Sequence, residues 1–450
     1  MLLMAAMVCH AQYRMVVMSD PHVMSKSLFE EPYGGAMLKT MQADLKVPED
    51  SQYLFDQFIG LMLREKPQLV LVPGDLTRDG EKVSHEYVAR RLGELKAAGI
   101  NVYVIPGNHD MENPLAYSYH GDKAMKVPSV SEKEFMQIYK NCGYGEAVST
   151  DTLTGSYMAY PADNLAVICM NSNIPNRYKA RYVHGRLSAA TLAWMERAAA
   201  KAHSEKRYII AMVHHEVMLH HNQAETFAPT ATTNMEKIKG QPSLSDVQNA
   251  FARAGIQVVL TGHYHIQSIT DVNTLFDKLT DVSTGSLSGF PSPYRYMTLN
   301  DDGRLTITSA TMFGNKTSKW PYTELSQKEM GRLRYMLQIY VPKLPGIKTN
   351  MTDAYSYLAD KMETVLCALA AGDEAGHSPK KAYTECMDAF DRYVRHAYNH
   401  NVISVDKVKA DPKGPYHQFS DLVRSIMYNY VGDRKHVNAD NSVVIKLQTQ

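Results

Sequence analysis

The sequence has few cysteines, almost no net charge and no long hydrophobic run. The five cysteines among 450 residues include no Cys-x-x-Cys pair, so a disulfide framework is not indicated. The 48 basic side chains nearly balance the 47 acidic ones, whereas broad binding of nucleic-acid phosphates needs a local excess of Lys and Arg. No apolar stretch reaches the length of about 18 residues that crosses a bilayer. We therefore expect no membrane span and no nucleic-acid partner.

The N-terminus carries a short apolar run. Its first nine residues read MLLMAAMVC, and the small residue Ala11 follows shortly after. This pattern resembles the hydrophobic region and cleavage site of a secretory signal, although the basic residues that usually come first are missing. The alternative is that the run only extends the first core strand. We expect residues 1–11 to be a signal remnant and the protein to be periplasmic or secreted; the alternative is a cytoplasmic protein.

Short β-branched segments alternate with amphipathic segments up to about residue 260. The expected strands are residues 13–18, 68–72, 101–105, 165–170, 207–213 and 257–260, and the expected helices are residues 51–66, 84–98, 188–202 and 246–254. This alternation predicts an α/β fold, with a mixed or largely parallel sheet covered by helices. Functional loops in such sheets gather beyond the carboxyl ends of the strands.

The pattern changes after residue 260. Three more strands are expected at residues 280–283, 295–300 and 304–308, the last two joined by a turn at Asp301-Asp302-Gly303. Four helical segments follow, at residues 323–340, 352–370, 379–399 and 418–430. We therefore divide the chain into a catalytic domain over residues 12–315 and a helical C-terminal domain over residues 316–450, which would serve as a lid, a docking element or a stabiliser.

Five polar clusters follow five of the expected strands. They are Asp20-Pro21-His22, Gly74 to Gly80 (GDLTRDG), Gly107-Asn108-His109-Asp110, His214-His215-Glu216 and Gly262-His263-Tyr264-His265. Taken alone, each cluster is more typical of a turn or a cap than of a metal site. Together they can converge if the strands share one core. Their two Asp, one Asn and four His would then suit two divalent cations that share a carboxylate.

The motifs DxH, GDxxxDG, GNHD, HH and GHxH, in this order, resemble those of calcineurin-like metallophosphoesterases across about residues 13–310. The resemblance implies a four-layer α/β/β/α sandwich and a metal-dependent hydrolase of phosphoric ester bonds. Its cofactors would be two divalent ions, of Mn, Fe or Zn. The ligands it implies are Asp20, His22 and His265 for the first ion, Asn108, His214 and His263 for the second, and Asp75 for both.

The resemblance also implies a mechanism. The ions would lower the pKa of a bridging water, and the resulting hydroxide would attack phosphorus without a covalent enzyme intermediate. His109 would face the leaving group as the general acid, oriented by Asp79 or Asp110.

The resemblance leaves other polar positions in and near these motifs open to more than one role. His215 would lie behind the ligands or face the substrate, while Arg78 either reaches a substrate phosphate or is a solvated loop residue. Glu216 follows where the family often has proline, which leaves the local loop shape open. His220 and His221 are expected at the surface or the rim of the site.

The expected substrate is a small phosphorylated molecule or a nucleotide, as a monoester or a diester. Cyclic-nucleotide phosphodiesterase activity is one alternative, because the metal centre would be common to both and variable loops set specificity. A catalytically silent module that binds phosphate ligands would be expected to have lost a ligand or the acid, and none is missing here. The charge balance disfavours a nuclease. No feature of the sequence indicates an oligomeric state.

Overall fold

The fold was determined from a computed structural model. It describes residues 12–42, 44, 46–173, 184–220, 232–235, 237–313 and 442–449, together with scattered positions between 324 and 420. The predicted signal segment, His221 and most of the four predicted C-terminal helices lie outside the described residues.

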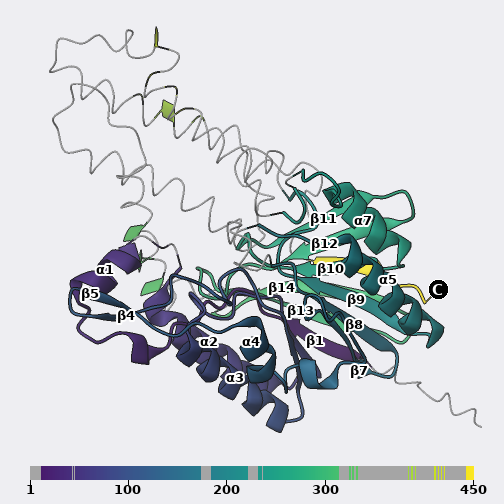
Figure 1. The fold of residues 1–450 in the computed structure, drawn as a ribbon, viewed down its shortest axis with the longest axis horizontal. Coiled ribbons are helices and arrows are strands. Elements are labelled where there is room, and N and C mark those ends of the chain that lie inside the picture. Colours follow the sequence, from purple (N-terminus) through teal and green to yellow (C-terminus); the bar gives the residue numbers. More distant parts are fainter. Residues whose placement is uncertain are drawn as a thin grey trace, which may run out of the picture.

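Two β-sheets pack face to face, and each carries helices on its outer face (Figure 1). The first sheet runs, from edge to edge, β15 (Ser442–Lys446), β14 (Arg304–Thr311), β13 (Pro293–Leu299), β1 (Tyr13–Val17), β2 (Leu69–Val72) and β3 (Asn101–Val104). The second runs β11 (Ser268–Asn273), β12 (Lys278–Ser283), β10 (Val258–Thr261), β9 (Tyr208–Val213), β8 (Leu165–Met170), β7 (Tyr157–Ala162) and β6 (Ser149–Thr150).

The helices form the two outer layers. Those on the first sheet are α2 (Pro48–Glu65), α3 (Lys82–Ala97) and α4 (Glu132–Ile138), and those on the second are α5 (Ala189–Ser204) and α7 (Leu244–Arg253). A small outlying unit contains α1 (Gly35–Gln42) and the hairpin β4 (Tyr117–His120) and β5 (Lys123–Lys126). Short 3-10 turns span Lys26–Leu28 and Tyr144–Glu146. None of the described helices is long and apolar enough to cross a membrane.

The central strands are buried on both faces, because successive side chains of a strand point in opposite directions. In β1, Met15 and Val17 contact the facing sheet, whereas Val16 packs under the helices. In β9, Ile210 faces the first sheet and Ile209 faces the helices of the second. The four-layer α/β/β/α architecture implied by the resemblance is therefore confirmed.

Local sequence signals explain several element boundaries. Helix α5 begins after Ser188, whose side chain accepts a hydrogen bond from the Thr191 N–H, and α7 begins at a capping box formed by Ser243 and Asp246. The predicted turn between β13 and β14 is present, with Gly303 at φ 81°. The sequence prediction missed the strands β4 to β7 and β11.

The predicted helical C-terminal domain over residues 316–450 did not include a strand, and the structure has one near its end. Residues Ser442–Lys446 form β15, which pairs antiparallel with β14 and places Thr308 opposite Ser442. Leu447 is buried between the two sheets. The strand pairs with residues more than a hundred positions away, so no local pattern assigns it to this sheet.

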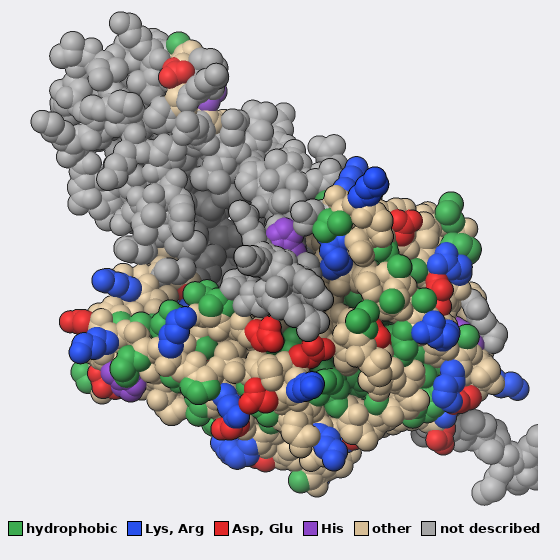
Figure 2. Space-filling model, viewed as in Figure 1, with side chains coloured by type: hydrophobic (Ala, Val, Ile, Leu, Met, Phe, Trp, Pro, Cys, Tyr) green, Lys and Arg blue, Asp and Glu red, His purple; other side chains and the backbone are tan. Residues whose placement is uncertain are grey.

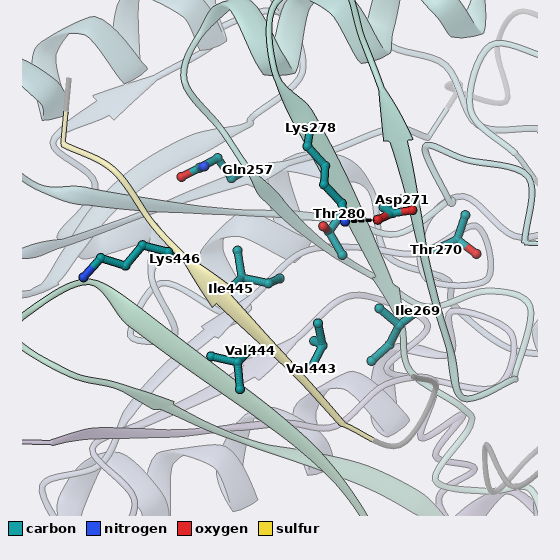
Figure 3. Close-up of a pocket in the computed structure, with 10 residues that line it drawn as sticks. All are labelled: Gln257, Ile269, Thr270, Asp271, Lys278, Thr280, Val443, Val444, Ile445 and Lys446. Carbon is teal, nitrogen blue, oxygen red and sulfur yellow. Dashed lines mark ion pairs between the residues drawn. The ribbon is translucent and has the colours of Figure 1, made fainter. Parts of the chain in front are cut away.

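A groove of about 350 Å³ lies between β15 and the strands β11 and β12 (Figure 3). Lys278 and Asp271 form an ion pair on its wall. Its lining includes none of the predicted metal ligands. On the described part of the face drawn in Figure 2, acidic and basic side chains are interspersed over the surface.

Docking of the last strand can be tested with Leu447→Ala. Leu447 is 2% exposed in the core between the sheets, so we expect the free energy of unfolding to fall by about 2–5 kcal/mol. Val444→Ala is the matched control, because Val444 lies in β15, three residues before Leu447, and is 61% exposed; its effect should stay within about 0.5 kcal/mol. Urea unfolding measures both. Equal effects for the two variants would show that this strand does not dock in the core.

Candidate metal centre

The five polar clusters meet at one end of the sandwich. Strands β1, β2 and β3 are parallel neighbours in the first sheet, as are β8, β9 and β10 in the second. Parallel strands end at the same edge of a sheet, so the loops that follow them lie together. The structure brings the predicted ligand residues of these loops into two adjoining groups.

The first group contains Asp20, His22, Asp75 and His265, whose possible ligand atoms all lie within 4.8 Å of one another. His22 Nε2 is 3.1 Å from His265 Nε2 and 3.5 Å from Asp75 Oδ2. Asp20 Oδ2 accepts hydrogen bonds from Ser19 Oγ and from the His263 N–H, whereas the buried Asp20 Oδ1 accepts none. A buried carboxylate oxygen without a donor, beside two imidazoles, suits a cation.

The second group contains His214, His215 and His263. His214 Nδ1 donates to the Pro73 carbonyl oxygen at 2.8 Å, so Nε2 is the free acceptor of the neutral ring. This Nε2 lies 3.0 Å from Asn108 Oδ1 and 3.4 Å from Asp75 Oδ2. These three acceptor atoms face one another, and a shared cation would satisfy all of them.

His215 is fully buried within the second group. Its Nδ1 lies 2.8 Å from Ser172 Oγ, its buried Nε2 has no hydrogen-bond partner, and its ring centroid is 4.6 Å from that of His263. The structure therefore places His215 beside the expected ligands, with a nitrogen that is itself able to bind a metal.

His109 lies next to the first group with its ring perpendicular to that of His22, at a centroid distance of 4.8 Å. Its Nδ1 donates to the Arg78 carbonyl oxygen at 2.6 Å and lies 3.1 Å from Asp79 Oδ1. Its side chain is 26% exposed. Because Nδ1 is held by two acceptors, Nε2 is the nitrogen left for a reacting group.

Asp110 is one of the two residues expected to orient His109, but its carboxylate makes its hydrogen bonds elsewhere. Its carboxylate accepts hydrogen bonds from the backbone N–H groups of Leu76, Thr77 and Gly107, at 2.8–3.0 Å. Burial, together with the charge of Asp75, raises the pKa of Asp110 to about 7. Asp110 thus ties the loop after β2 to the loop after β3, while Asp79 contacts the His109 ring.

Arg78 is not a solvated loop residue, so that expectation is wrong. Its guanidinium is mostly buried, forms an ion pair with Asp79 and lies 3.3 Å from Asp44 Oδ2. The alternative expectation, contact with a substrate phosphate, remains a prediction. Asp44 carried no sequence signal, because it lies outside every motif and far from Arg78 in the chain.

The backbone of the site is in an unusual conformation. Left-handed φ angles of 41–64° occur at Asp20, His22, Asp75, His263 and His265. Residues other than glycine held in this region cost of order 1–3 kcal/mol each, and such strain concentrates at functional sites. The Gly262–His265 segment is therefore not an extended strand. His263 and His265 nevertheless join different groups, because the loop turns between them.

Two further residues, Glu216 and His220, surround the site. Glu216, where relatives often have proline, accepts hydrogen bonds from the Tyr264 N–H at 3.2 Å and from Ser283 Oγ at 3.0 Å. It thereby holds the loop between His263 and His265. His220 is buried rather than at the surface, with Nδ1 2.9 Å from Ser268 Oγ and Nε2 3.3 Å from Asp281 Oδ2.

Comparison with known proteins places this site in a family. The family model described as calcineurin-like phosphoesterase matches residues 13–267, more than half of the chain. That segment includes all five polar loops, whereas β13, β14 and β15 lie beyond it. No curated protein gives a significant sequence match.

Two solved structures illustrate the likeness. A dimetal phosphatase from Danio rerio is 13% identical, with a TM-score of 0.46 over 67% of this chain and 96% of that one. Purple acid phosphatase PPD1 from yellow lupin (Lupinus luteus) seeds is 13% identical, with a TM-score of 0.44 over 68% of this chain and 52% of that one. This chain therefore matches about half the length of the lupin protein.

The close approach of two loops can be tested with Gly107→Ala. A Cβ atom at Gly107 would lie 2.2 Å from Asp75 Oδ1 and 2.3 Å from the Asp75 backbone N, so Asp75 must move. We expect the metal content per chain to fall by half or more, measured by elemental analysis. Gly93→Ala in α3 is the matched control, because a Cβ there meets nothing within 4 Å, and it should stabilise the helix by about 1 kcal/mol. Full metal binding by Gly107→Ala would contradict this account of the site.

Proposed function

We propose that this chain, a member of the calcineurin-like phosphoesterase family and a metal-dependent hydrolase of phosphate esters, acts on small phosphorylated molecules or nucleotides. The reaction would take place at a centre of two divalent ions. The observation that carries the proposal is the position of Asp75. Its Oδ2 lies 3.5 Å from His22 Nε2 and 3.4 Å from His214 Nε2. One carboxylate oxygen thus adjoins both groups of metal-competent side chains.

The donor set supports a pair of ions of the Mn, Fe or Zn type, because it mixes imidazole nitrogens with carboxylate and amide oxygens. Asp20, His22 and His265 would hold one ion, and Asn108, His214 and His263 the other, with Asp75 contacting both. When bound, such ions supply Lewis-acid chemistry: they offset charge on phosphate oxygens and lower the pKa of coordinated water. His215, with its free Nε2, would support the second set.

His109 would act as the general acid. Hydrolysis forms a bond from a water oxygen to phosphorus and breaks the bond from phosphorus to the leaving oxygen, which then needs a proton. The His109 ring is held through Nδ1 by Arg78 and Asp79, and its Nε2 is free to donate that proton. The carboxylate of Asp79 favours the charged imidazolium. Positioned proton transfer of this kind contributes about 10²–10⁴-fold to a rate.

The proposal is tested with the purified full-length chain after chelation and reloading with Mn, Fe or Zn. The substrates are p-nitrophenyl phosphate, bis-p-nitrophenyl phosphate and cyclic nucleotides. We expect chelation to lower kcat by at least about 100-fold, which corresponds to the few kcal/mol that metal ions supply in such reactions, and reloading to restore it. Asp75→Asn, prepared in parallel, controls for contaminating phosphatases.

The arms of this experiment separate the alternatives. Turnover of the diester or of cyclic nucleotides far above that of the monoester would identify a phosphodiesterase. Absence of turnover with every metal and substrate class would contradict the proposal, as would activity that survives chelation. Binding of inorganic phosphate by a chain that turns over none of these esters would favour the silent binding module.

A further inference from the structure

A short helical segment of the C-terminal half packs against the residues that precede α2. The described positions of this segment are 324, 325, 327, 328, 331 and 332, all helical. Leu325 is buried in an apolar cluster with Val47, Leu54 and Phe290. Lys328 Nζ lies 2.5 Å from Asp50 Oδ2. The segment is therefore seated on the start of α2 by both apolar and charged contacts.

Arg332 makes the most buried of these polar contacts among the described residues of the segment. It is 5% exposed and forms an ion pair with Glu49, which is 2% exposed. Its guanidinium also donates a hydrogen bond to the Lys46 carbonyl oxygen. A buried ion pair is costly to break, because the remaining charge is left without a partner. Arg332 thus holds the backbone at Lys46 and the side chain of Glu49.

Lys46 is connected to His109 by a series of hydrogen bonds and ion pairs. Asp44 Oδ1 accepts a hydrogen bond from the Lys46 N–H at 3.1 Å, and Asp44 Oδ2 lies 3.3 Å from Arg78 Nη2.

The other end of the Arg78 guanidinium pairs with Asp79 Oδ2, and Asp79 Oδ1 lies 3.1 Å from His109 Nδ1. Charge-assisted hydrogen bonds therefore link the C-terminal segment to the proposed general acid. The Arg78 guanidinium contacts both Asp44 and Asp79. Only one oxygen of Asp79 is used by Arg78, and the other is left to contact His109.

We propose that Arg332 is a positioning residue of the phosphoesterase reaction, which holds Asp44 against Arg78 and so keeps Asp79 in place to orient His109. The inference rests on the proposed function, since it requires His109 to protonate the leaving oxygen. It gives the C-terminal segment a part in the chemistry, although the segment contributes no metal ligand among its described residues.

The test uses two monoesters that differ in their need for an acid, phenyl phosphate with a poor leaving group and p-nitrophenyl phosphate with a good one. We expect Arg332→Met to lower kcat for phenyl phosphate by about 10-fold, and for p-nitrophenyl phosphate by less than about 3-fold, because general-acid help is needed mainly by the poorer leaving group. His109→Ala should show the same selectivity with a larger loss. Arg332→Lys, which keeps the charge, should recover part of the phenyl phosphate rate.

A double-mutant cycle separates positioning from a general structural effect. If Arg332 acts through His109, the variant with both changes should have the phenyl phosphate rate of His109→Ala alone. Lys328→Met is the matched control: it breaks an ion pair of the same segment with α2 but leaves the Lys46 carbonyl contact in place, so its leaving-group dependence should match that of the wild type. Metal content and circular dichroism are measured for every variant.

Several outcomes would overturn the inference. One is that the rate losses of Arg332→Met and His109→Ala multiply in the double variant. Another is that Arg332→Met lowers kcat equally for both esters. If Arg332→Met does not fold, Asp44→Asn tests the same link, and a wild-type leaving-group dependence in Asp44→Asn would overturn it as well. If His109→Ala itself leaves the leaving-group dependence unchanged, the general-acid role in the proposed function fails, and the inference fails with it. Failure of the Arg332 arm alone leaves that role intact.

Discussion

The structure around the site depends on one buried carboxylate, Asp75. Burying a charge is expensive unless neighbouring groups compensate it. Asp75 Oδ1 accepts a hydrogen bond from the His109 N–H at 2.8 Å, and Oδ2 adjoins the rings of His22 and His214. Burial opposes ionisation of this carboxyl, but the imidazoles, His214 foremost, hold its pKa well below the usual range. The loops after four strands must therefore meet at this point, and the left-handed backbone at several of them follows from that convergence.

Much of the fold could be predicted because its signals are local. Continuous apolar runs such as Leu165–Met170 mark strands buried on both faces, and serine caps mark the starts of α5 and α7. The ligand residues could be proposed for a related reason, since each follows a predicted strand and parallel strands share an edge. Neither step needs knowledge of contacts between distant segments.

The remainder could not be predicted, because it depends on such contacts. Nothing in the local sequence distinguishes Asp79, which contacts His109, from Asp110, which binds three backbone N–H groups. Arg78 has no local signal for its partner Asp44, and Glu216 contacts a loop almost fifty residues away. The edge strand β15 pairs with a strand that precedes the whole C-terminal segment. In each case the missing information is the identity of the partner.

The proposed bridging of two ions by Asp75 is measured by metal counting combined with electron paramagnetic resonance. The wild-type chain and Asp75→Asn are stripped, loaded with manganese and compared. We expect two ions per wild-type chain with the spectrum of a magnetically coupled pair, and the loss of at least one ion and of the coupling in Asp75→Asn. A single ion in the wild type, or a coupled pair that survives in Asp75→Asn, would contradict it.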